Sequence, residues 1–504
     1  MSVALLAGLC LGLCVGLALF HVAVGAVSVR VVGLRSLRRL STGLSMAGFA
    51  VGLTALLYLA IVWISGAAPP ETQWFGLRFD ATGAALVAMV TLVGGAVLRF
   101  SQNYLDGDAR QDAFLGGLHL TLATVILFVL SANLLTFALG WVAMSLTLHK
   151  LLVFYPDRVG ARLAAHKKFL LARLSDAALV LAFIGLYRAT GSLDMTEIAA
   201  RLPGAAPFDV TLAALLLVVA AVLKSAQFPV HGWLIEVMET PTPVSALLHA
   251  GVVNAGGVLL LRFSDVLMLS PVAQGLLVLL ALGSIIVGSL AMMAQNSVKA
   301  ALAWSTVAQM GFMLLQCALG AFGAALFHIL AHAAYKANAF LTAGTLSDKK
   351  PVQDRSVAAL LPLAVLAGLS LTLLATGTLS ASLLVTLLAA MGVVTVLEAR
   401  RPLILTVVTA GMVTLALLGH GVIERLLGEA SLNVSPLLAT VTVAGMVILC
   451  IGQWLALSAP RWPPVMALYV HLKNGFYINT WLRAYFVQRE SQRRSMQRNN
   501  ALNL

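Results

Sequence analysis

Long apolar runs recur almost without interruption along this sequence, from Val3 to Leu457. A helix needs about 20 consecutive apolar residues to cross the ~30 Å hydrocarbon layer of a membrane. Only 10% of the residues are charged and 60% are hydrophobic, whereas an ordinary soluble domain has roughly 25% charged residues. The sequence therefore predicts an all-α polytopic membrane protein, with about 15 transmembrane helices of that length.

The predicted spans follow one another closely. The first run lacks a basic leader and a small-residue cleavage site, so it is predicted to be a retained helix and not a signal peptide. The long apolar run between residues 355 and 400 is divided at "ATGTLS". The approximate centres are residues 14, 53, 90, 122, 144, 178, 218, 253, 282, 310, 333, 365, 387, 411 and 446, with boundaries accurate to a few residues.

Basic residues gather after the odd-numbered spans and give a predicted orientation. The formal net charge of +13 would suggest nucleic acid in a soluble protein, but these positions indicate a membrane surface, and we expect no nucleic-acid partner. By the positive-inside rule, these loops and the C-terminus lie in the cytoplasm and the N-terminus lies outside. The residues are Arg30, Arg35, Arg38, Arg39, Arg158, Arg162, Lys167, Lys168, Lys349, Lys350, Arg400 and Arg401.

The C-terminal segment from residue 459 to 504 is basic and aromatic. It is either an interfacial segment lying on anionic lipid or a docking surface for a cytoplasmic partner. Its distinctive residues are Arg483, Arg489, Arg493, Arg494 and Arg498, beside Phe476, Tyr477, Trp481, Tyr485 and Phe486.

Motifs that bind nucleotides, flavins or iron–sulfur clusters are not found. The four cysteines, Cys10, Cys14, Cys317 and Cys450, stand singly in apolar runs, without C-x-x-C spacing. No G-x-G-x-x-G sequence or P-loop is present. We therefore expect no cofactor and no metal site in this chain.

Ionisable residues inside the spans are few. One group of them lies in the seventh span. A lysine or arginine at the bilayer centre costs on the order of 2.5–3.5 kcal/mol even on the lenient insertion scale, so such residues usually face a bundle interior or a wet cavity. The sequence "VLKSAQFPVHGWL" places Lys224 five residues before Pro229, with His231 beyond it. Proline interrupts helices, so we expect a helix broken near 224 to 231, as at transporter ion sites. The alternative is a lysine that snorkels from a helix end.

The eighth and tenth spans add more polar side chains. His249 lies one to two turns into the eighth span, and Glu236 precedes it in a short link. A lone buried histidine is more often satisfied by a carbonyl, but near Lys224 its ordinary pKa of about 6.5 suits a proton relay. The tenth span, "SVKAALAWSTVAQMG", contains Ser305 and begins near Lys299. Lys299 belongs either to the same path or to the membrane interface.

The eleventh span contains "FHILAHAAYK", in which His328, His332 and Lys336 are four residues apart. Four residues are about 400° of helix rotation, so the three side chains form one nearly straight stripe. The stripe could bind a metal, but a glutamate of the H-E-x-x-H type is missing. It could also join helices as a structural polar seam. A path for protons or ions fits best.

The first half of the chain has polar residues that could extend this path. His149 ends the fifth span, and Lys168, Arg173 and Asp176 lie near the start of the sixth. Asp176 is three residues after Arg173, so the alternative is a simple ion pair between the two. The sequence does not show whether these residues touch the others.

The motifs "KSAQFPVHGWL", "PTPVSALLHAG", "VKAALAWSTVAQMG" and "FHILAHAAYKANAFLTAGT" resemble the antiporter-like membrane subunits of respiratory complex I and Mrp sodium/proton antiporters. The resemblance covers roughly residues 70 to 350. It implies two inverted five-helix repeats with broken helices, and a proton-translocation axis. The residues that match this axis are Lys224, Lys299, Lys336, His249, His328 and His332.

Two features of those pumps are missing. A glutamate commonly follows the tryptophan of their fifth helix, whereas Val142 follows Trp141 here. Their broken twelfth helix carries a lysine, whereas "GTLSASLL", residues 377–384, has none.

A second resemblance accommodates these losses. "SLTLHKLLVFYPDR", "AAHKKFLLARLSD" and "HLKNGFYIN" look like the membrane subunits of bacterial DAB inorganic-carbon accumulation systems. The resemblance implies a bacterial inner-membrane protein with a periplasmic N-terminus. It also implies a large cytoplasmic zinc partner related to β-carbonic anhydrases, which holds the zinc and carries out carbon dioxide hydration.

The sequence interpretation is thus an ion-translocating subunit and not an enzyme. It would let protons, or alternatively sodium ions, drive the partner toward one-way formation of bicarbonate. The other hypotheses are a pumping or Na⁺/H⁺-antiporting subunit of an oxidoreductase-like or Mrp-like complex, and a passive membrane anchor. The expected divisions are residues 1–112 (helices 1–3), 113–265 (first repeat), 266–400 (second repeat), 401–458 (C-terminal helices) and 459–504 (tail).

Overall fold

The structure is a computed structural model of the chain. It describes residues 3–27, 33–66, 72–344, 435–458 and 461–478, with isolated positions between 383 and 426 and at 484 and 488. The predicted spans around 365, 387 and 411, the segment 377–384 and most of the basic tail therefore lie outside the continuously described residues. So do Lys349, Lys350, Arg400 and Arg401.

Helices account for nearly all of the described chain. Each predicted span centre from 14 to 333, and that at 446, lies in a helix or, for residue 253, in a 3₁₀ turn. The helices are α1 (Val3–Val27), α2 (Leu34–Ser65), α3 (Ala81–Tyr104), α4 (Gln111–Val129), α5 (Leu134–Leu152), α6 (Val159–Thr190), α7 (Met195–Arg201), α8 (Pro207–Lys224), α9 (Gly232–Glu236), α10 (Thr242–Ala250), α11 (Ala255–Arg262), α12 (Ser264–Met268), α13 (Pro271–Met293), α14 (Val298–Ala318), α15 (Phe322–Leu341), α19 (Pro436–Ser458) and α20 (Pro463–Lys473). The 3₁₀ turns are η1 (Leu202–Gly204), η2 (Val237–Glu239), η3 (Val252–Asn254) and η5 (Gly475–Tyr477).

Eleven spans among the described residues are long and apolar enough to cross a membrane, the pair α10–α11 counting as one. The chain is an integral membrane protein. One departure from the all-α expectation is a short antiparallel hairpin of β1 (Thr72–Trp74) and β2 (Leu77–Phe79) between α2 and α3.

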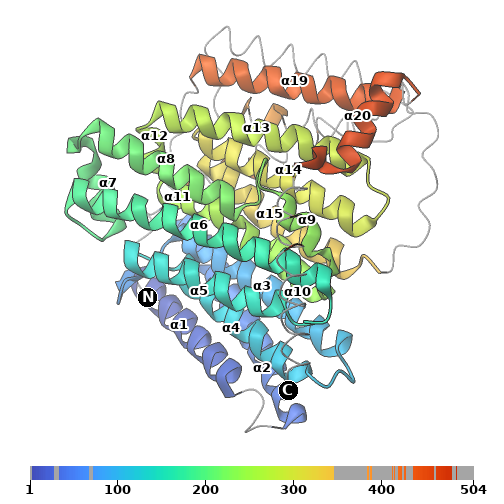
Figure 1. Cartoon of the computed structure of the whole chain (residues 1–504). Coiled ribbons are helices and arrows are strands. Elements are labelled where there is room, and N and C mark those ends of the chain that lie inside the picture. The colour runs from blue at the N-terminus through green and yellow to red at the C-terminus, as the bar shows by residue number, and fades with distance from the viewer. Residues whose placement is uncertain are drawn as a thin grey trace, which may run out of the picture.

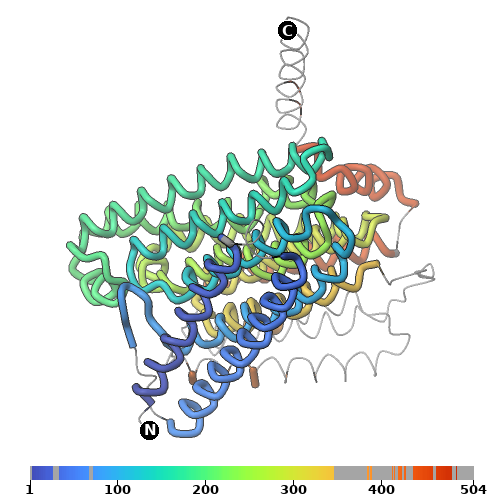
Figure 2. Tube along the Cα trace, turned by 90° about the horizontal axis from the view of Figure 1, so that it is seen from below, coloured from blue at the N-terminus to red at the C-terminus, as the bar shows by residue number. Residues whose placement is uncertain are grey.

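The spans form a bundle with α1 and α2 at one side and α19 at the other, as Figure 1 shows. Seen from below, α1 and α2 lie in front of the other helices (Figure 2). In Figure 1, α6, α8 and α13 run between an end that carries α7 and α12 and an end that carries α20. We call these the α7 end and the α20 end. Near the middle, α10 packs against α15 and α3.

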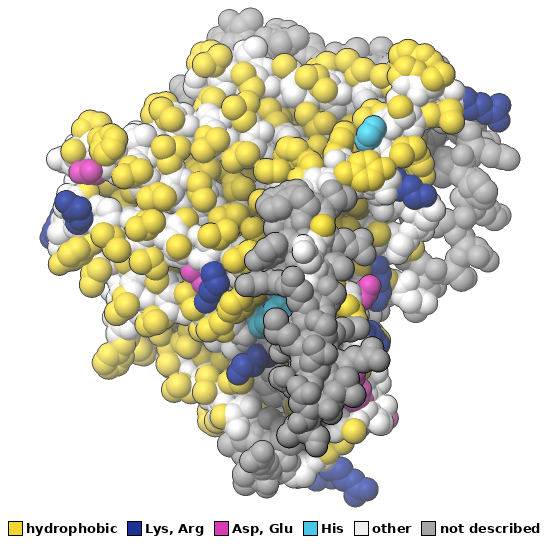
Figure 3. Space-filling model, in the orientation of Figure 1, with side chains coloured by type: hydrophobic (Ala, Val, Ile, Leu, Met, Phe, Trp, Pro, Cys, Tyr) yellow, Lys and Arg dark blue, Asp and Glu magenta, His cyan; other side chains and the backbone are white. Residues whose placement is uncertain are grey.

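The outer surface is apolar where lipid tails would meet it. In Figure 3, hydrophobic side chains predominate over the face formed by α6, α8 and α13. Leu170, Leu174 and Leu181 of α6 are among the exposed side chains. A surface of this kind is what a bundle needs when its solvent is hydrocarbon.

Two spans are interrupted inside the bundle. α8 ends at Lys224, and α9 begins at Gly232, so the predicted break is confirmed. The interruption starts before Pro229, because Ala226 takes a left-handed conformation with φ of 52°. A second interruption, which the sequence did not reveal, separates α10 from α11 at Gly251 and η3.

A buried ion-pair cluster at the α7 end ties four segments together. Asp80 caps α3 by accepting a hydrogen bond from the backbone N–H of Gly83 at 2.6 Å. Its carboxylate pairs with Arg78 of β2 at 3.2 Å and with Arg262 of α11. Arg262 also donates to the carbonyl of Val129, at the end of α4, at 2.9 Å. The hairpin, α3, α4 and α11 therefore meet at one carboxylate.

This cluster predicts that Asp80→Asn destabilises the protein. The Asp80 side chain is 14% exposed and that of Arg262 is 4% exposed. Removing one partner of a buried pair typically costs about 3–5 kcal/mol, because the other charge is left uncompensated. We expect a lower thermal unfolding midpoint for the detergent-purified variant. Asp265→Asn, a substitution at an exposed carboxylate on α12, is the matched control, and an equal loss in both variants would contradict the prediction.

The same cluster predicts the pH dependence of that difference. Burial raises the pKa of Asp80, but the guanidinium groups of Arg262 and Arg78 and the Gly83 N–H outweigh it, so the net pKa lies below its usual value. A carboxyl of this kind stabilises the fold above its unfolded pKa of about 3.9 and loses that effect as the pH falls through its lower folded pKa. The wild-type advantage over Asp80→Asn should therefore shrink below about pH 4.

Candidate ion-translocation site

Lys224 occupies the last position of α8, where the helix is interrupted. Its side chain is buried, and its ammonium donates a hydrogen bond to the carbonyl of Trp141 on α5 at 3.1 Å. The same nitrogen lies 4.1 Å from the centre of the Trp141 ring. A carbonyl and an aromatic face thus hold this buried charge. The snorkelling alternative is wrong, because the side chain does not reach the surface.

Three residues of α6 complete a first cluster around Lys224. The ammonium of Lys168, also buried, donates to the carbonyl and hydroxyl oxygens of Ser145 at 3.0 and 3.1 Å. Arg173 and Asp176 form the predicted ion pair at 2.7 Å. Asp176 does more than pair with Arg173, because its charge also acts on Lys224 and Lys168. α6 and α8 therefore bring together two lysines, one arginine and one carboxylate, and α5 supplies neutral partners for the lysines.

The carboxylate of this cluster comes from α6. Val142 follows Trp141 on α5 and leaves the position of the pump glutamate uncharged. Asp176 is 8% exposed and supplies the negative charge beside Lys224. The missing glutamate thus does not leave the first cluster without an acid.

The interrupted segment after Lys224 connects α8 to the centre of the bundle. The hydroxyl of Ser225 donates to the carbonyl of Val253 in η3 at 2.9 Å. The amide of Gln227 donates to the carbonyl of Ser225 at 2.8 Å and reaches that of Val307 on α14 at 3.4 Å. Freed backbone groups inside a membrane protein need such partners. The segment therefore links the first cluster to η3 and α14.

His249 begins a second cluster on α10. Its ring is fully buried, stacks on Phe340 of α15 at 4.4 Å between centroids, and shares a 3.0 Å hydrogen bond between Nδ1 and the hydroxyl of Thr306. Thr306 precedes Val307, which Gln227 contacts. α14 therefore meets both interrupted spans within one turn.

The predicted stripe on α15 is confirmed as a row of neighbouring side chains. The rings of His328 and His332 lie 6.0 Å apart. Lys336 is fully buried and donates to the carbonyl of Leu302 at 2.9 Å and to the hydroxyl of Ser305. Lys336, His332 and His249 act electrostatically on one another. Lysine and histidines from α15 and α10 therefore form the second cluster.

His328 lies at the edge of this cluster. It shares a 3.1 Å hydrogen bond with Gln316 of α14 and packs on Phe312. Among the residues that the structure describes, no group of three His, Cys, Asp or Glu side chains has the arrangement of a metal site. The described side chains thus give the metal hypothesis for the stripe no third ligand.

Several buried polar atoms between the clusters have no protein hydrogen-bond partner among the described residues. Buried polar groups are normally paired with protein or ordered water. The residues that carry these atoms belong to the interrupted segment after α8, to η3, to α10 and to α15. The atoms are Oε1 of Gln227, Oδ1 of Asn254, Nε2 of His249 and both ring nitrogens of His332.

The structure places the remaining predicted residues around the two clusters. Lys299 is half-buried at the start of α14 and donates to the hydroxyl of Thr242 at 3.0 Å. Glu236 pairs with Lys167 at 2.7 Å at the α20 end. His149 packs against Phe169, 5.0 Å between ring centroids. None of these three side chains has a described hydrogen bond to Lys224 or Lys336.

His231 is fully buried and meets the C-terminal part of the chain. Its ring lies 4.8 Å from that of Trp304. Gly475 of η5 packs closely against both rings. A Cβ atom added to Gly475 would lie 3.2 Å from Trp304 and 3.9 Å from His231. Gly475 has a φ of 58°, so glycine suits both its backbone and its close approach.

The family described as NADH:quinone oxidoreductase/Mrp antiporter, TM, matches residues 131–419, more than half of the chain and both clusters. The chain belongs to this family.

Within the family, the chain is similar to inorganic carbon transporter subunits. The probable inorganic carbon transporter subunit DabB2 of Halothiobacillus neapolitanus is 36% identical over 455 residues, which are 83% of this chain and 81% of that protein. The probable subunit DabB of Hydrogenovibrio crunogenus is 40% identical over 315 residues, 61% of this chain and 60% of that protein. The chain is thus a DabB-type member of the antiporter-like family.

Two solved structures share the fold. A chain of the Mrp complex from Dietzia sp. DQ12-45-1b gives a TM-score of 0.56 at 21% identity, over 91% of this chain and 52% of that one. A chain of an archaeal membrane-bound sulfane sulfur reductase gives 0.59 at 17% identity, over 94% and 99%. Both similarities show that the chains share a fold, and nothing further.

Sequence reasoning missed the neutral partners of the charged residues. Trp141, Ser145 and Thr306 hold Lys224, Lys168 and His249, yet such residues are common in apolar helices. Their i, i+4 spacing on α5 was the one available signal for Trp141 and Ser145.

The hydrogen bond to His249 predicts that Thr306→Val destabilises the second cluster. Valine has the shape of threonine without the hydroxyl, so Nδ1 of His249 loses its partner, and an unsatisfied buried polar group costs about 1–3 kcal/mol. We expect a lower thermal unfolding midpoint. Thr440→Val, at an exposed threonine of α19, should change stability by only about 0.5 kcal/mol or less; a Thr306→Val midpoint no lower than that of this control would contradict the prediction.

Proposed function

We propose that this chain conducts protons inward through the bundle and couples that movement to inorganic-carbon uptake. One observation carries the proposal: two clusters of buried ionisable side chains are joined by the interrupted segment after Lys224 and by polar atoms that lack protein partners. Ionisable residues inside a membrane protein usually mark ion paths or proton relays. Sodium is the alternative ion.

The path runs from the first cluster to the second. A proton carried by Lys168, Asp176 and Lys224 would pass the region of Gln227 and Asn254 and reach His249. Water bridging the unpartnered oxygens and ring nitrogens would connect these groups. From His249 the path continues to His332 and Lys336. Lys299, Arg173, Ser305 and His328 would tune the charges nearby, and His149, His231 and Glu236 would line the approaches.

We propose that the driven reaction takes place in a partner subunit. The DabB relatives are named as subunits of inorganic carbon transporters, which supports a second subunit. The resemblance to DAB systems suggests a large cytoplasmic zinc protein related to β-carbonic anhydrases, which would convert carbon dioxide to bicarbonate in one direction. One charge moved through 100 mV supplies about 2.3 kcal/mol, enough to bias a two-state element of the partner.

The positions of the basic residues support an orientation. We propose that the α20 end, which holds Lys167 and Arg158, faces the cytoplasm of a bacterium. The N-terminus would then be periplasmic, and the protein would lie in the inner membrane. Residues 113–265 and 266–400 would form the two inverted repeats, the first of them containing the observed break of α8.

The main alternative is a pumping or Na⁺/H⁺-antiporting subunit of an oxidoreductase-like or Mrp-like complex. An NADH-ubiquinone oxidoreductase chain 5 of Metridium senile is 38% identical over 279 residues, 46% of its length. Copurification with iron–sulfur subunits, or sodium/proton exchange in everted vesicles, would favour this alternative. A passive anchor would leave bicarbonate accumulation insensitive to uncouplers.

The buried position of Lys336 predicts that Lys336→Ala abolishes carbon uptake. The assay is growth in ambient air of a carbonic-anhydrase-deficient bacterium that expresses this chain with the zinc-protein gene adjacent to its own. Wild-type chain should rescue growth, and the variant should not, because the second cluster loses its ammonium. Lys150→Ala, at an exposed lysine of α5, should rescue fully. Rescue by Lys336→Ala would refute the role of Lys336.

The first cluster predicts that Asp176→Asn slows proton movement. Removing this carboxylate leaves Lys224, Lys168 and Arg173 without their negative partner. We expect proton flux in everted membrane vesicles to fall by about tenfold or more, equivalent to about 1.4 kcal/mol. Asp209→Asn, at an exposed position at the start of α8, should retain wild-type flux. Equal flux in the two variants would count against the first cluster.

A further inference from the structure

Two buried histidines meet in the N-terminal helices, away from both clusters. His21 of α1 and His119 of α4 are 4% and 0% exposed. Their Nδ1 atoms are 2.7 Å apart, and Nε2 of His119 lies 2.8 Å from the hydroxyl of Ser41 on α2. Three helices thus bring two imidazoles and a hydroxyl into one hydrogen-bonded row.

The contact between two ring nitrogens requires one shared proton. One imidazole must carry hydrogen on Nδ1 and donate it, while the other presents a lone pair. Two arrangements satisfy the row equally. Either His21 donates to His119, and His119 donates from Nε2 to Ser41, or Ser41 donates to His119, and His119 donates from Nδ1 to His21. To interconvert them with both rings neutral, one proton moves across the 2.7 Å contact, one is added at Nε2 of His21, one is lost from Nε2 of His119, and the hydroxyl turns.

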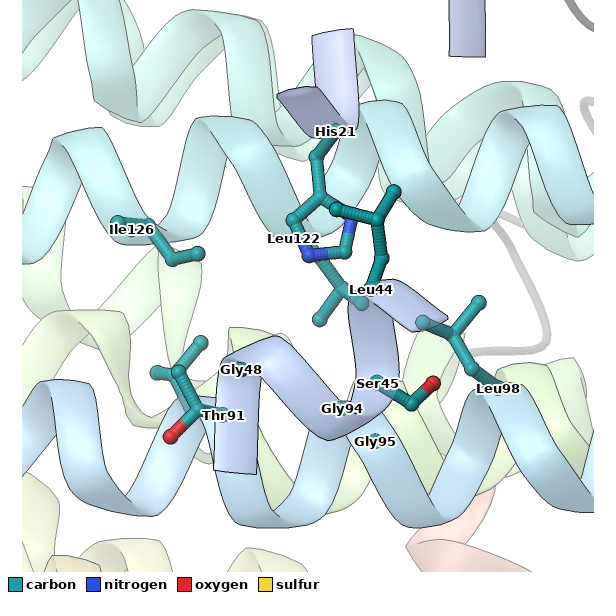
Figure 4. A pocket seen from close by; sticks show the side chains of 11 residues that line it. His21, Leu44, Ser45, Gly48, Thr91, Gly94, Gly95, Leu98, Leu122 and Ile126 are labelled. Atoms are coloured by element: carbon teal, nitrogen blue, oxygen red, sulfur yellow. The ribbon is translucent and has the colours of Figure 1, made fainter. Parts of the chain in front are cut away.

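A small pocket lies beside this row. It is narrow, with room for about one water molecule, and His21, Ser45 and Thr91 are its polar lining residues. Figure 4 shows the His21 ring projecting between Leu44 and Leu122 toward the pocket. Because Nδ1 of His21 is used by His119, its Nε2 is the atom available to the pocket. Pocket and row together form a protonatable site with an opening.

Polar side chains of α2 and α3 make a second set of contacts. Thr42, next to Ser41, donates to the side chain of Gln102 on α3 at 3.3 Å. Gln102 in turn donates to the carbonyl of Arg38 at 3.3 Å, and Arg38 pairs with Asp106 at 2.6 Å near the surface. The histidine row and the group at Thr42, Gln102 and Arg38 are therefore two sets of polar contacts that both involve α2.

We propose that His21, His119 and Ser41 form a proton relay that exchanges protons with the pocket. A proton taken up at Nε2 of His21 releases the proton on its Nδ1 to Nδ1 of His119. His119 then passes the proton on its Nε2 to the Ser41 oxygen, and Ser41 releases its original hydroxyl proton on the side away from His119. One proton enters and one leaves, and the two rings end in the other tautomeric arrangement. Reorientation of the rings, or the reverse transfer, resets the row.

Few other titratable groups act on the pair. The neighbouring helices carry Cys14 on α1, Arg38 on α2, Arg99 on α3 and His149 on α5. Within the described part of the chain, the hydrogen bonds and charge interactions of the two rings involve only each other and Ser41. A titration observed at these rings would therefore report on the pair.

The first test needs no substitution and does not depend on the proposed function. The full chain, in complex with its partner and labelled with ¹⁵N-histidine, would be studied by solid-state NMR in lipid between about pH 5 and pH 9. The relay predicts that the Nδ1 signals of both rings change together as the pair takes up a third ring proton in addition to the one that each neutral ring carries. A single fixed tautomer over the whole range overturns the relay and leaves the pair as a contact that joins helices. His119→Gln assigns the signals.

The second test measures transport and rests on the proposed proton conduction. We expect His119→Gln and His21→Gln to lower proton flux in vesicles by about tenfold, while His471→Gln, at an exposed histidine of α20, keeps it. Wild-type flux in both variants, with flux lost in Lys336→Ala, overturns the relay and leaves the proposed function. If the wild-type chain itself carries no flux, the proposed function fails, and the NMR result alone decides the relay.

Discussion

An ionisable side chain buried in a membrane protein must find polar partners inside the protein, and the arrangement of this bundle follows from that requirement. A regular helix offers few, because its carbonyls are already bonded along the helix. Lys224 and Lys336 therefore take carbonyls of neighbouring helices, from Trp141 and Leu302. Where more partners are needed, the chain leaves the helical conformation, as it does after Lys224 and at Gly251.

The two interruptions give the bundle its centre. Ser225 from one interrupted span contacts η3 of the other, and α14 receives both Gln227 and His249. Charged residues on α6 and α15, far apart in the sequence, are thus connected through neutral polar groups. A change at one cluster can reach the other through backbone and hydroxyl contacts, without an ion pair that spans the distance.

The sequence was sufficient to predict the spans and the ionisable residues within them. It was not sufficient to predict the neutral groups that hydrogen-bond to those residues. The apolar runs predicted every described span, Pro229 predicted the break of α8, and four-residue spacing predicted the stripe on α15. The break at Gly251 was missed because glycine is common in membrane helices. His21 and His119 were missed because each is a lone histidine in an apolar run, and only the packing of α1 on α4 pairs them.

The segment after α19, residues 461–478, packs against the bundle. η5 presses Gly475 against Trp304 and His231, and the hydroxyl of Tyr469 and the carbonyl of Lys473 lie against Ala294 and Gln295, in the turn between α13 and α14. Residues 461–478 therefore form part of the wall around the broken α8. A chain shortened after α19 would lose the contact of Gly475 with Trp304 and His231 and the contacts of residues 469 and 473 with the turn between α13 and α14.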